Sequence, residues 1–241
     1  MRACFSLTVI LSMFCFLPSG LTQEDLTLSQ AKQMFSEADK NLNTLYQKAK
    51  TDLSEWEFGK LQEEQRVWLE SRDERAEMAA HFNGQAEEGK EKENAEYWRA
   101  LAQFTDTRAV IVEAWIKADS FTKSWEGMWI DGNGGRMAII EGGDDTIRFR
   151  IDVVRGPTYH LGSIGGVAFA KNQTARFSTR IDDMSDETWI TMVKRGKKIE
   201  VIGENTMYYH GARAYFDGDY IRVSEDLTEE ERNEVENPPE Y

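Results

Sequence analysis

The chain has 241 residues and a formal net charge of −14, with 43 acidic and 29 basic side chains. Such acidity disfavours nucleic acids and anionic membranes as partners, because their phosphates need a basic surface, and it favours a basic protein partner. Acidity alone also keeps an exported protein in solution. The chain's two cysteines, Cys4 and Cys15, lie in the first 22 residues. If that segment is removed, disulfides, thiolate metal sites and cysteine nucleophiles are excluded.

Residues 1–22 have the pattern of a secretory signal peptide. Arg2 precedes an apolar run over residues 5–17, and Pro18-Ser19-Gly20 ends the run with a helix breaker and small residues. The run is shorter than the roughly 20 residues that span a bilayer, which favours cleavage over a membrane anchor. A bulky residue precedes Cys15, so a lipid anchor is not favoured. We expect an exported protein, periplasmic or extracellular, with no stable membrane insertion after signal cleavage.

Residues 23–119 are predicted to form a helical domain. The segment from Ser29 to Ala118 contains no proline. Apolar side chains recur there at steps of three and four residues in three stretches, at about residues 31–46, 61–76 and 97–115. An antiparallel three-helix bundle would bury these three stripes.

Two patterns on the first two predicted helices resemble the N-terminal domain of LprI-type lysozyme inhibitors. An A-D-x-x-L-N-x-x-Y helix precedes a Q-x-x-W-x-x-x-R-D helix, and the matching residues are Asp39, Asn43, Tyr46, Gln65, Trp68, Arg72 and Asp73. The resemblance covers about residues 30–118 and implies a non-catalytic inhibitor of a lysozyme. The family usually has a cysteine shortly after the R-D pair, where this chain has Glu74-Arg75-Ala76. A disulfide-tied version of the domain is therefore excluded.

We favour a structural interpretation of these motif residues over direct ligand contact. The polar members of the set would form a network inside the bundle, in which an arginine–carboxylate pair between neighbouring helices fixes their register. Trp68 and Tyr46 would then be core aromatic residues.

Residues 120–224 are predicted to form an antiparallel β domain. The clearest strand is Thr146–Val154, where apolar residues alternate with Arg148, Arg150 and Asp152. Seven further strands are expected: Trp125–Ile130, Arg136–Ile140, Ile164–Ala170, Thr174–Thr179, Thr188–Val193, Lys198–Ile202 and Tyr220–Val223. Turn sequences rich in Gly, Asn and Asp separate several of them. The expected fold class is thus α+β, with a three-helix bundle followed by a barrel-like domain of about eight strands.

A barrel of this kind could also carry a small ligand in a deep apolar interior. An interior filled by Phe149, Phe177, Trp189 and their neighbours would argue against that function.

Two segments of the β domain, residues 154–162 and 208–218, combine Tyr, His, Arg and Gly. Loops on a rigid sheet are favoured places for binding, and Tyr and Arg are enriched at interface hot spots. The predicted partner-binding residues are Arg155, Tyr159, His160, His210, Arg213 and Tyr215. The alternative is that Tyr and His close the barrel with satisfied hydrogen bonds. The sequence does not decide whether the two segments meet in space.

No catalytic or cofactor motif is recognisable, and we expect neither an enzyme nor a metal or cofactor site. The segment Gly162-Ser163-Ile164-Gly165 only superficially approaches a nucleophile elbow. Residues 225–241 form an acidic tail that we expect to be disordered, although Thr228 and Glu231 could cap a short helix.

Two leading functions remain beside the small-ligand barrel. The first is an exported binding protein that occludes a basic glycan-cleaving enzyme such as a lysozyme. The second is an envelope-associated structural or interaction module without an enzyme target. Neither the target nor the oligomeric state follows from the sequence.

Overall fold

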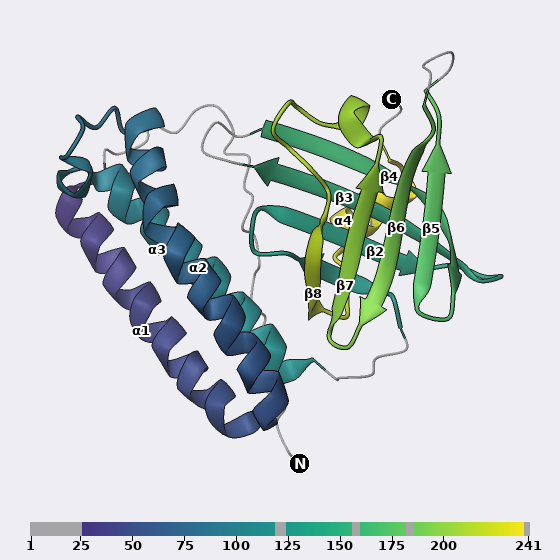
Figure 1. Ribbon diagram of the computed structural model, residues 1–241, viewed down its shortest axis with the longest axis horizontal. Coiled ribbons are helices and arrows are strands. Elements are labelled where there is room, and N and C mark those ends of the chain that lie inside the picture. Colours follow the sequence, from purple (N-terminus) through teal and green to yellow (C-terminus); the bar gives the residue numbers. More distant parts are fainter. Residues whose placement is uncertain (1–25, 119–123, 156–159, 182–185, 239–241) are drawn as a thin grey trace.

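The computed structural model describes residues 26–118, 124–155, 160–181 and 186–238. Three long helices lie beside a closed eight-stranded antiparallel β-barrel (Figure 1). The predicted α+β fold class is confirmed. The predicted signal peptide at residues 1–22 lies outside the described residues.

The helical part consists of α1, α2 and α3, and α3 packs against both other helices. The bounds are Leu28–Asp52 for α1, Glu55–Phe82 for α2 and Ala95–Lys117 for α3, with a short 3-10 helix, η1, at Glu91–Glu93. Thr27 and Ser54 each begin a helix with a capping box. Because Ser54 caps α2 directly after α1 ends, only two residues separate these helices. The Asn94 side chain caps α3 by accepting from the Glu96 N–H.

Buried side chains tie the third helix to the other two. At one end of the bundle, Tyr97 and Leu101 of α3 pack against alanines 76, 79 and 80 of α2. At the other end, Trp115 of α3 lies in a cluster with Leu42, Leu61 and Trp68. This second cluster continues into the barrel through Ile221. The bundle therefore packs directly on the outer wall of the barrel.

The barrel strands follow one another in chain order, and the last strand closes against the first. Their bounds are β1 Gly127–Ile130, β2 Gly135–Glu141, β3 Thr146–Arg155, β4 His160–Lys171, β5 Thr174–Thr179, β6 Thr188–Arg195, β7 Lys198–Glu204 and β8 Gly218–Ser224. Each of the eight predicted strands is present, and β5 has the predicted bounds. A short 3-10 helix, η2 (Thr206–Tyr209), follows β7.

Side chains fill the barrel interior. Trp129, Phe149, Phe216 and Tyr220 are among the largest of them and are almost completely buried. Phe149 and Phe177 meet edge to face, with ring centroids 5.2 Å apart. Trp189, by contrast, points outward and is 37% exposed, so it does not help to fill the interior. Because side chains pack its interior, the barrel serves as a structural core.

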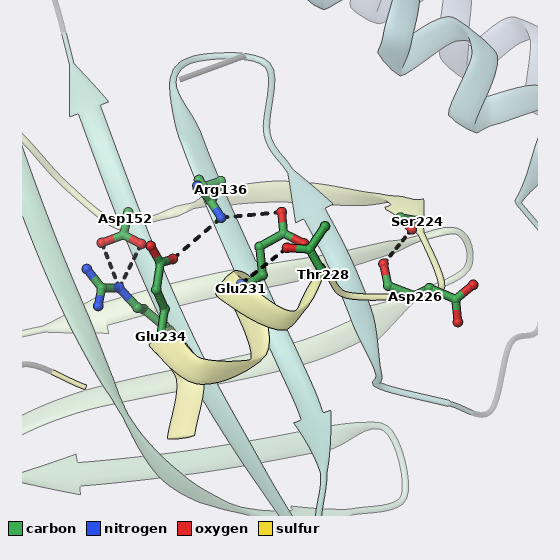
Figure 2. A network of polar contacts seen from close by, with 8 residues as sticks. Arg136, Asp152, Ser224, Asp226, Thr228, Glu231 and Glu234 are labelled. Carbon is green, nitrogen blue, oxygen red and sulfur yellow. Dashed lines mark hydrogen bonds and ion pairs between the residues drawn. The ribbon is translucent and has the colours of Figure 1, made fainter. Parts of the chain in front are cut away.

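The predicted disorder of the tail is corrected for residues 225–238, which include the helix α4 (Glu229–Glu236). The Thr228–Glu231 capping box begins this helix, and Val235 is buried against the outer face of β1 and β2. Figure 2 shows Arg136 of β2 reaching both Glu231 and Glu234, at 3.5 and 3.7 Å. The burial of Val235 and the ion pairs of Arg136 hold the acidic tail against the barrel. The composition of the tail does not predict these contacts.

Lys197 of the β6–β7 turn and Lys198, the first residue of β7, link the barrel to the bundle. Lys197 donates to the Trp115 carbonyl oxygen at 2.7 Å and pairs with Glu57 at 3.1 Å. Lys198 Nζ lies 2.6 Å from Glu64 Oε1 of α2. Lys197 is nearly buried. These contacts hold the start of β7 against helices α2 and α3, which lie far away from it in the sequence.

Candidate functional site

The chain between β7 and β8 folds over one end of the barrel. Three of its side chains, Tyr209, Ala214 and Phe216, are buried in the barrel core. Tyr220 of β8 donates its hydroxyl to the Phe216 carbonyl oxygen at 2.9 Å, and burial raises the pKa of this hydroxyl. Tyr220 therefore stays protonated and holds the segment down.

The two Tyr–His–Arg–Gly segments meet at this end of the barrel. Gly162 and His210 form an isolated antiparallel bridge, and the Gly211 N–H donates to the Leu161 carbonyl oxygen at 2.8 Å. A Cβ on Gly162 would lie 2.5 Å from the His210 Cβ. Glycine at position 162 is therefore required for the two segments to approach this closely.

Arg155 lies beneath this surface rather than on it. Its guanidinium forms an ion pair with Asp131, with Nη1 and Oδ2 2.6 Å apart. Its Nε donates to the Tyr215 carbonyl oxygen at 3.1 Å, and its Cζ lies 4.4 Å from the centroid of the Tyr215 ring. Because the Arg155 side chain is only 3% exposed, it supports Tyr215 from below.

The histidines lie at the edge of the bridge. His210 shares hydrogen bonds with Thr206 Oγ1 through Nε2 and with the Gly211 carbonyl oxygen through Nδ1. Its ring also meets Phe216 edge to face, with centroids 5.5 Å apart. His160 begins β4 opposite Arg155 and is partly exposed. Tyr159 lies outside the described residues.

Several large side chains project from this end of the barrel. We call the group the loop-end surface; its exposed members are Leu161 (62% exposed), Met207 (68%), Tyr208 (42%), Arg213 and Tyr215 (47%). Sequence reasoning missed Leu161, Met207 and Tyr208 as candidate contacts. The sequence does contain a signal for them. All three lie outside the predicted strands, so strand periodicity gives no reason to expect that they are buried.

The family-motif residues of the bundle form short local contacts. Asn43 donates to Asp39 at 2.9 Å, and Arg72 donates to its neighbour Asp73 at 2.8 Å. The ring of Tyr46 packs on Phe58, with centroids 5.4 Å apart. Trp68 is 8% exposed, as expected of a core aromatic residue.

The polar link between neighbouring helices comes from Arg108, not from Arg72. Arg108 Nε donates to Gln65 Oε1 at 2.7 Å, and its Nη1 lies 3.8 Å from Glu64 Oε2. Burial lowers the pKa of Arg108. The pairing of Arg72 with Asp73 on the same helix does not set helix register, whereas the contact from Arg108 on α3 to Gln65 on α2 does.

A cleft of about 480 Å³ lies between the bundle and the β1–β2 turn. Its walls include Trp68 and Arg108 from the helices and Asp131 and Lys198 from the barrel. The described residues contain no group of three or more His, Cys, Asp or Glu side chains placed to hold a metal ion. Both places present aromatic faces and charged side chains, which are groups suited to binding.

The comparisons with known proteins address the helical part. Residues 21–110 match the family described as lysozyme inhibitor LprI. This confirms the resemblance inferred from the two helix motifs, and the β-barrel follows the matched region. LprI is a family of inhibitors rather than of enzymes. No curated protein matches the chain, and no solved structure matches it.

The LprI match includes all seven motif residues as well as Gln65's partner Arg108. It ends before the barrel begins, so the loop-end surface lies outside it. Within the described part of the chain, none of the helices is long and apolar enough to cross a membrane.

Proposed function

We propose that this protein is an exported, non-catalytic binding protein that occludes a basic glycan-cleaving enzyme of the lysozyme kind. The match of residues 21–110 to the lysozyme inhibitor family is the observation that carries this proposal. The family supplies the kind of target, and the geometry of the barrel supplies the surface that would meet it.

The loop-end surface has the composition of a protein-binding hot spot. Tyr208 and Tyr215 offer large amphipathic rings, and Met207 and Leu161 surround them with apolar area. The bridge between Gly162 and His210 holds the two segments in one arrangement, so little conformational entropy would be lost on binding. In the matched helical region Trp68 is buried, but Trp56 and Phe82 are 71% and 58% exposed, so the surface of that region is the alternative place for the target to bind.

Among the residues predicted from sequence, the exposed ones suit direct contact and the buried one does not. His160, His210 and Arg213 would engage the carboxylates of the enzyme's cleft, while Tyr215 packs on its wall. Arg155 would act indirectly by holding Tyr215, since its guanidinium already pairs with Asp131.

The charge of the chain favours a basic target. At a net charge of −14, the protein would attract a cationic enzyme and raise the association rate at low salt. Export would bring the two together in the periplasm or outside the cell. We place the boundary between the helical and β domains near residue 119, as the composition suggests.

A lysozyme turbidity assay at low and at physiological salt tests the proposal. We expect inhibition that saturates near one protein per enzyme at both salt concentrations. Inhibition that disappears at physiological salt would mean charge attraction without a specific interface. If several lysozyme types are not inhibited at either salt, the envelope-associated interaction module becomes the better explanation.

A further inference from the structure

One outer face of the barrel carries large apolar side chains beside arginines. The strand register places Phe169 of β4, Arg176 of β5, Thr191 of β6 and Ile202 of β7 opposite one another in a single row. Trp189 lies on the same face, two residues from Thr191, with Ser178 opposite it. The row spans three inter-strand spacings, or about 14 Å.

The apolar members of this face are unusually exposed. Phe169 is 72% exposed, Val167 44%, Ile202 38% and Trp189 37%. The alternate residues of the same strands, such as Ala168 and Ile190, are completely buried in the barrel core. Contiguous apolar area on a protein surface commonly marks an interaction site. Because the barrel is closed, a partner cannot add a strand here and must contact the side chains.

Two arginines lie at one end of this face, whereas Glu204, opposite Trp189, lies at the other end. Arg148, opposite Val167, and Arg176, opposite Phe169, are both exposed. Neither has an ion pair with another described residue. By contrast, Arg150 pairs with Asp152 on the same sheet surface. Two exposed guanidinium groups that form no ion pair with a described residue, at the Val167–Phe169 end of the face, favour an anionic ligand there.

We propose that this face, made of Arg148, Val167, Phe169, Arg176, Trp189 and Ile202, binds an acidic polysaccharide. The rings of Phe169 and Trp189 would pack on the apolar faces of sugar rings, and Arg148 and Arg176 would bind their carboxylates in the bidentate geometry that guanidinium favours. The hydroxyls of Ser178 and Thr191, which lie beside Trp189 and Arg176, would bond to sugar hydroxyls.

The shape of the face favours a glycan over an acidic protein. The row crosses four strands, and the short hydroxyl side chains of Thr191 and Ser178 lie opposite Arg176 and Trp189. A length of about 14 Å suits an oligomer better than a single sugar. This binding goes beyond the inhibitor function and does not depend on it: it would hold the protein on a glycan matrix whether or not a lysozyme is its target.

The test is calorimetric titration of the purified protein with an oligogalacturonate, in the absence of any lysozyme. The methyl-esterified form of the same oligomer, which lacks the charges, serves as the ligand control. We expect Arg176→Gln and Phe169→Ser each to weaken binding of the acidic oligomer at least fivefold. Arg66→Gln, which removes an exposed arginine of α2, should leave binding unchanged.

Four results would overturn the proposal. They are no binding of the acidic oligomer, equal binding of the esterified form, an equal loss in Arg66→Gln, and equally tight binding of polyglutamate. The last of these would indicate an acidic protein partner. Analytical ultracentrifugation tests whether a second copy of this chain occupies the face instead. A dimer that Phe169→Ser dissociates would also overturn the proposal.

Discussion

Asp131 and Arg155 form an ion pair in which both side chains are 3% exposed, with 2.6 Å between Oδ2 and Nη1. Asp131 also accepts from the N–H groups of Asn133 and Gly135, both at 2.8 Å. The pair thus joins the β1–β2 turn to the end of β3 directly beneath Tyr215. A buried charge pair of this kind is costly to break, because one partner is left without compensation.

We therefore expect Asp131→Asn to lower the free energy of unfolding by about 3 to 5 kcal/mol, measured by urea denaturation. The control is Arg195→Gln, which removes an ion pair to Glu200 in which the arginine is 64% exposed. That change should cost less than about 1 kcal/mol. A loss from Asp131→Asn no larger than that of the control would mean that the buried pair is not a structural support.

The bridge at Gly162 makes a steric prediction. In Gly162→Ala the new Cβ would lie 2.5 Å from the His210 Cβ and 3.0 Å from Val153 Cγ2. We expect a loss of about 1 to 3 kcal/mol in unfolding free energy, together with weaker inhibition, because the two segments must separate. In Gly59→Ala, by contrast, the Cβ has open space around it within a helix, and a gain of up to about 1 kcal/mol is expected. Equal effects of the two changes would contradict the close approach.

The regular elements could be predicted because their patterns are local. Alternation in residues 146–154 gives β3 one polar and one apolar face, and the steps of three and four residues define the stripes of α1 to α3. Strand β6 was harder, because both of its faces carry apolar residues: Trp189 and Val193 on one, Ile190 and Met192 on the other. Periodicity could not decide which face lies inside, and the structure places Trp189 on the outer one.

The candidate site was only partly accessible from sequence. Composition identified the two Tyr–His–Arg–Gly segments, but their meeting depends on the Gly162–His210 bridge, which joins residues 48 positions apart. The burial of Arg155 depends on Asp131 from another turn. Likewise, α4 is stabilised by the ion pairs of Arg136 of β2 and by the packing of Val235 on apolar side chains of β1 and β2. Contacts between distant segments leave no local pattern, and these were the ones missed.

Lys194 gives a prediction about pH. Its side chain is nearly buried, its Nζ lies 4.3 Å from the centroid of the Trp125 ring, and burial lowers its pKa from 10.5 to about 8. Between pH 8 and 10.5 the unfolded chain therefore binds more protons at this residue than the folded chain does. The contribution of Lys194 to the free energy of unfolding rises with pH across this window.

Lys194→Met should remove this contribution. Between pH 8 and 10.5, we expect the unfolding free energy of the original protein to rise by about 1 to 3 kcal/mol relative to that of the variant. Urea denaturation of both proteins at the two pH values measures the difference, and changes at other lysines cancel. Parallel pH profiles would show that the Lys194 pKa is not lowered by folding.

The central claim, that the loop-end surface blocks a lysozyme, is tested most directly by the inhibition constant of the double variant Tyr208→Ala, Tyr215→Ala at physiological salt. Both side chains are over 40% exposed, so folding should survive, and circular dichroism checks this. Trp56→Ala, on α2 and 71% exposed, is the matched aromatic control. We predict at least tenfold weaker inhibition for the double variant and unchanged inhibition for Trp56→Ala. Inhibition that the double change leaves intact, or that Trp56→Ala removes, would contradict the account and move the binding surface to the helical part.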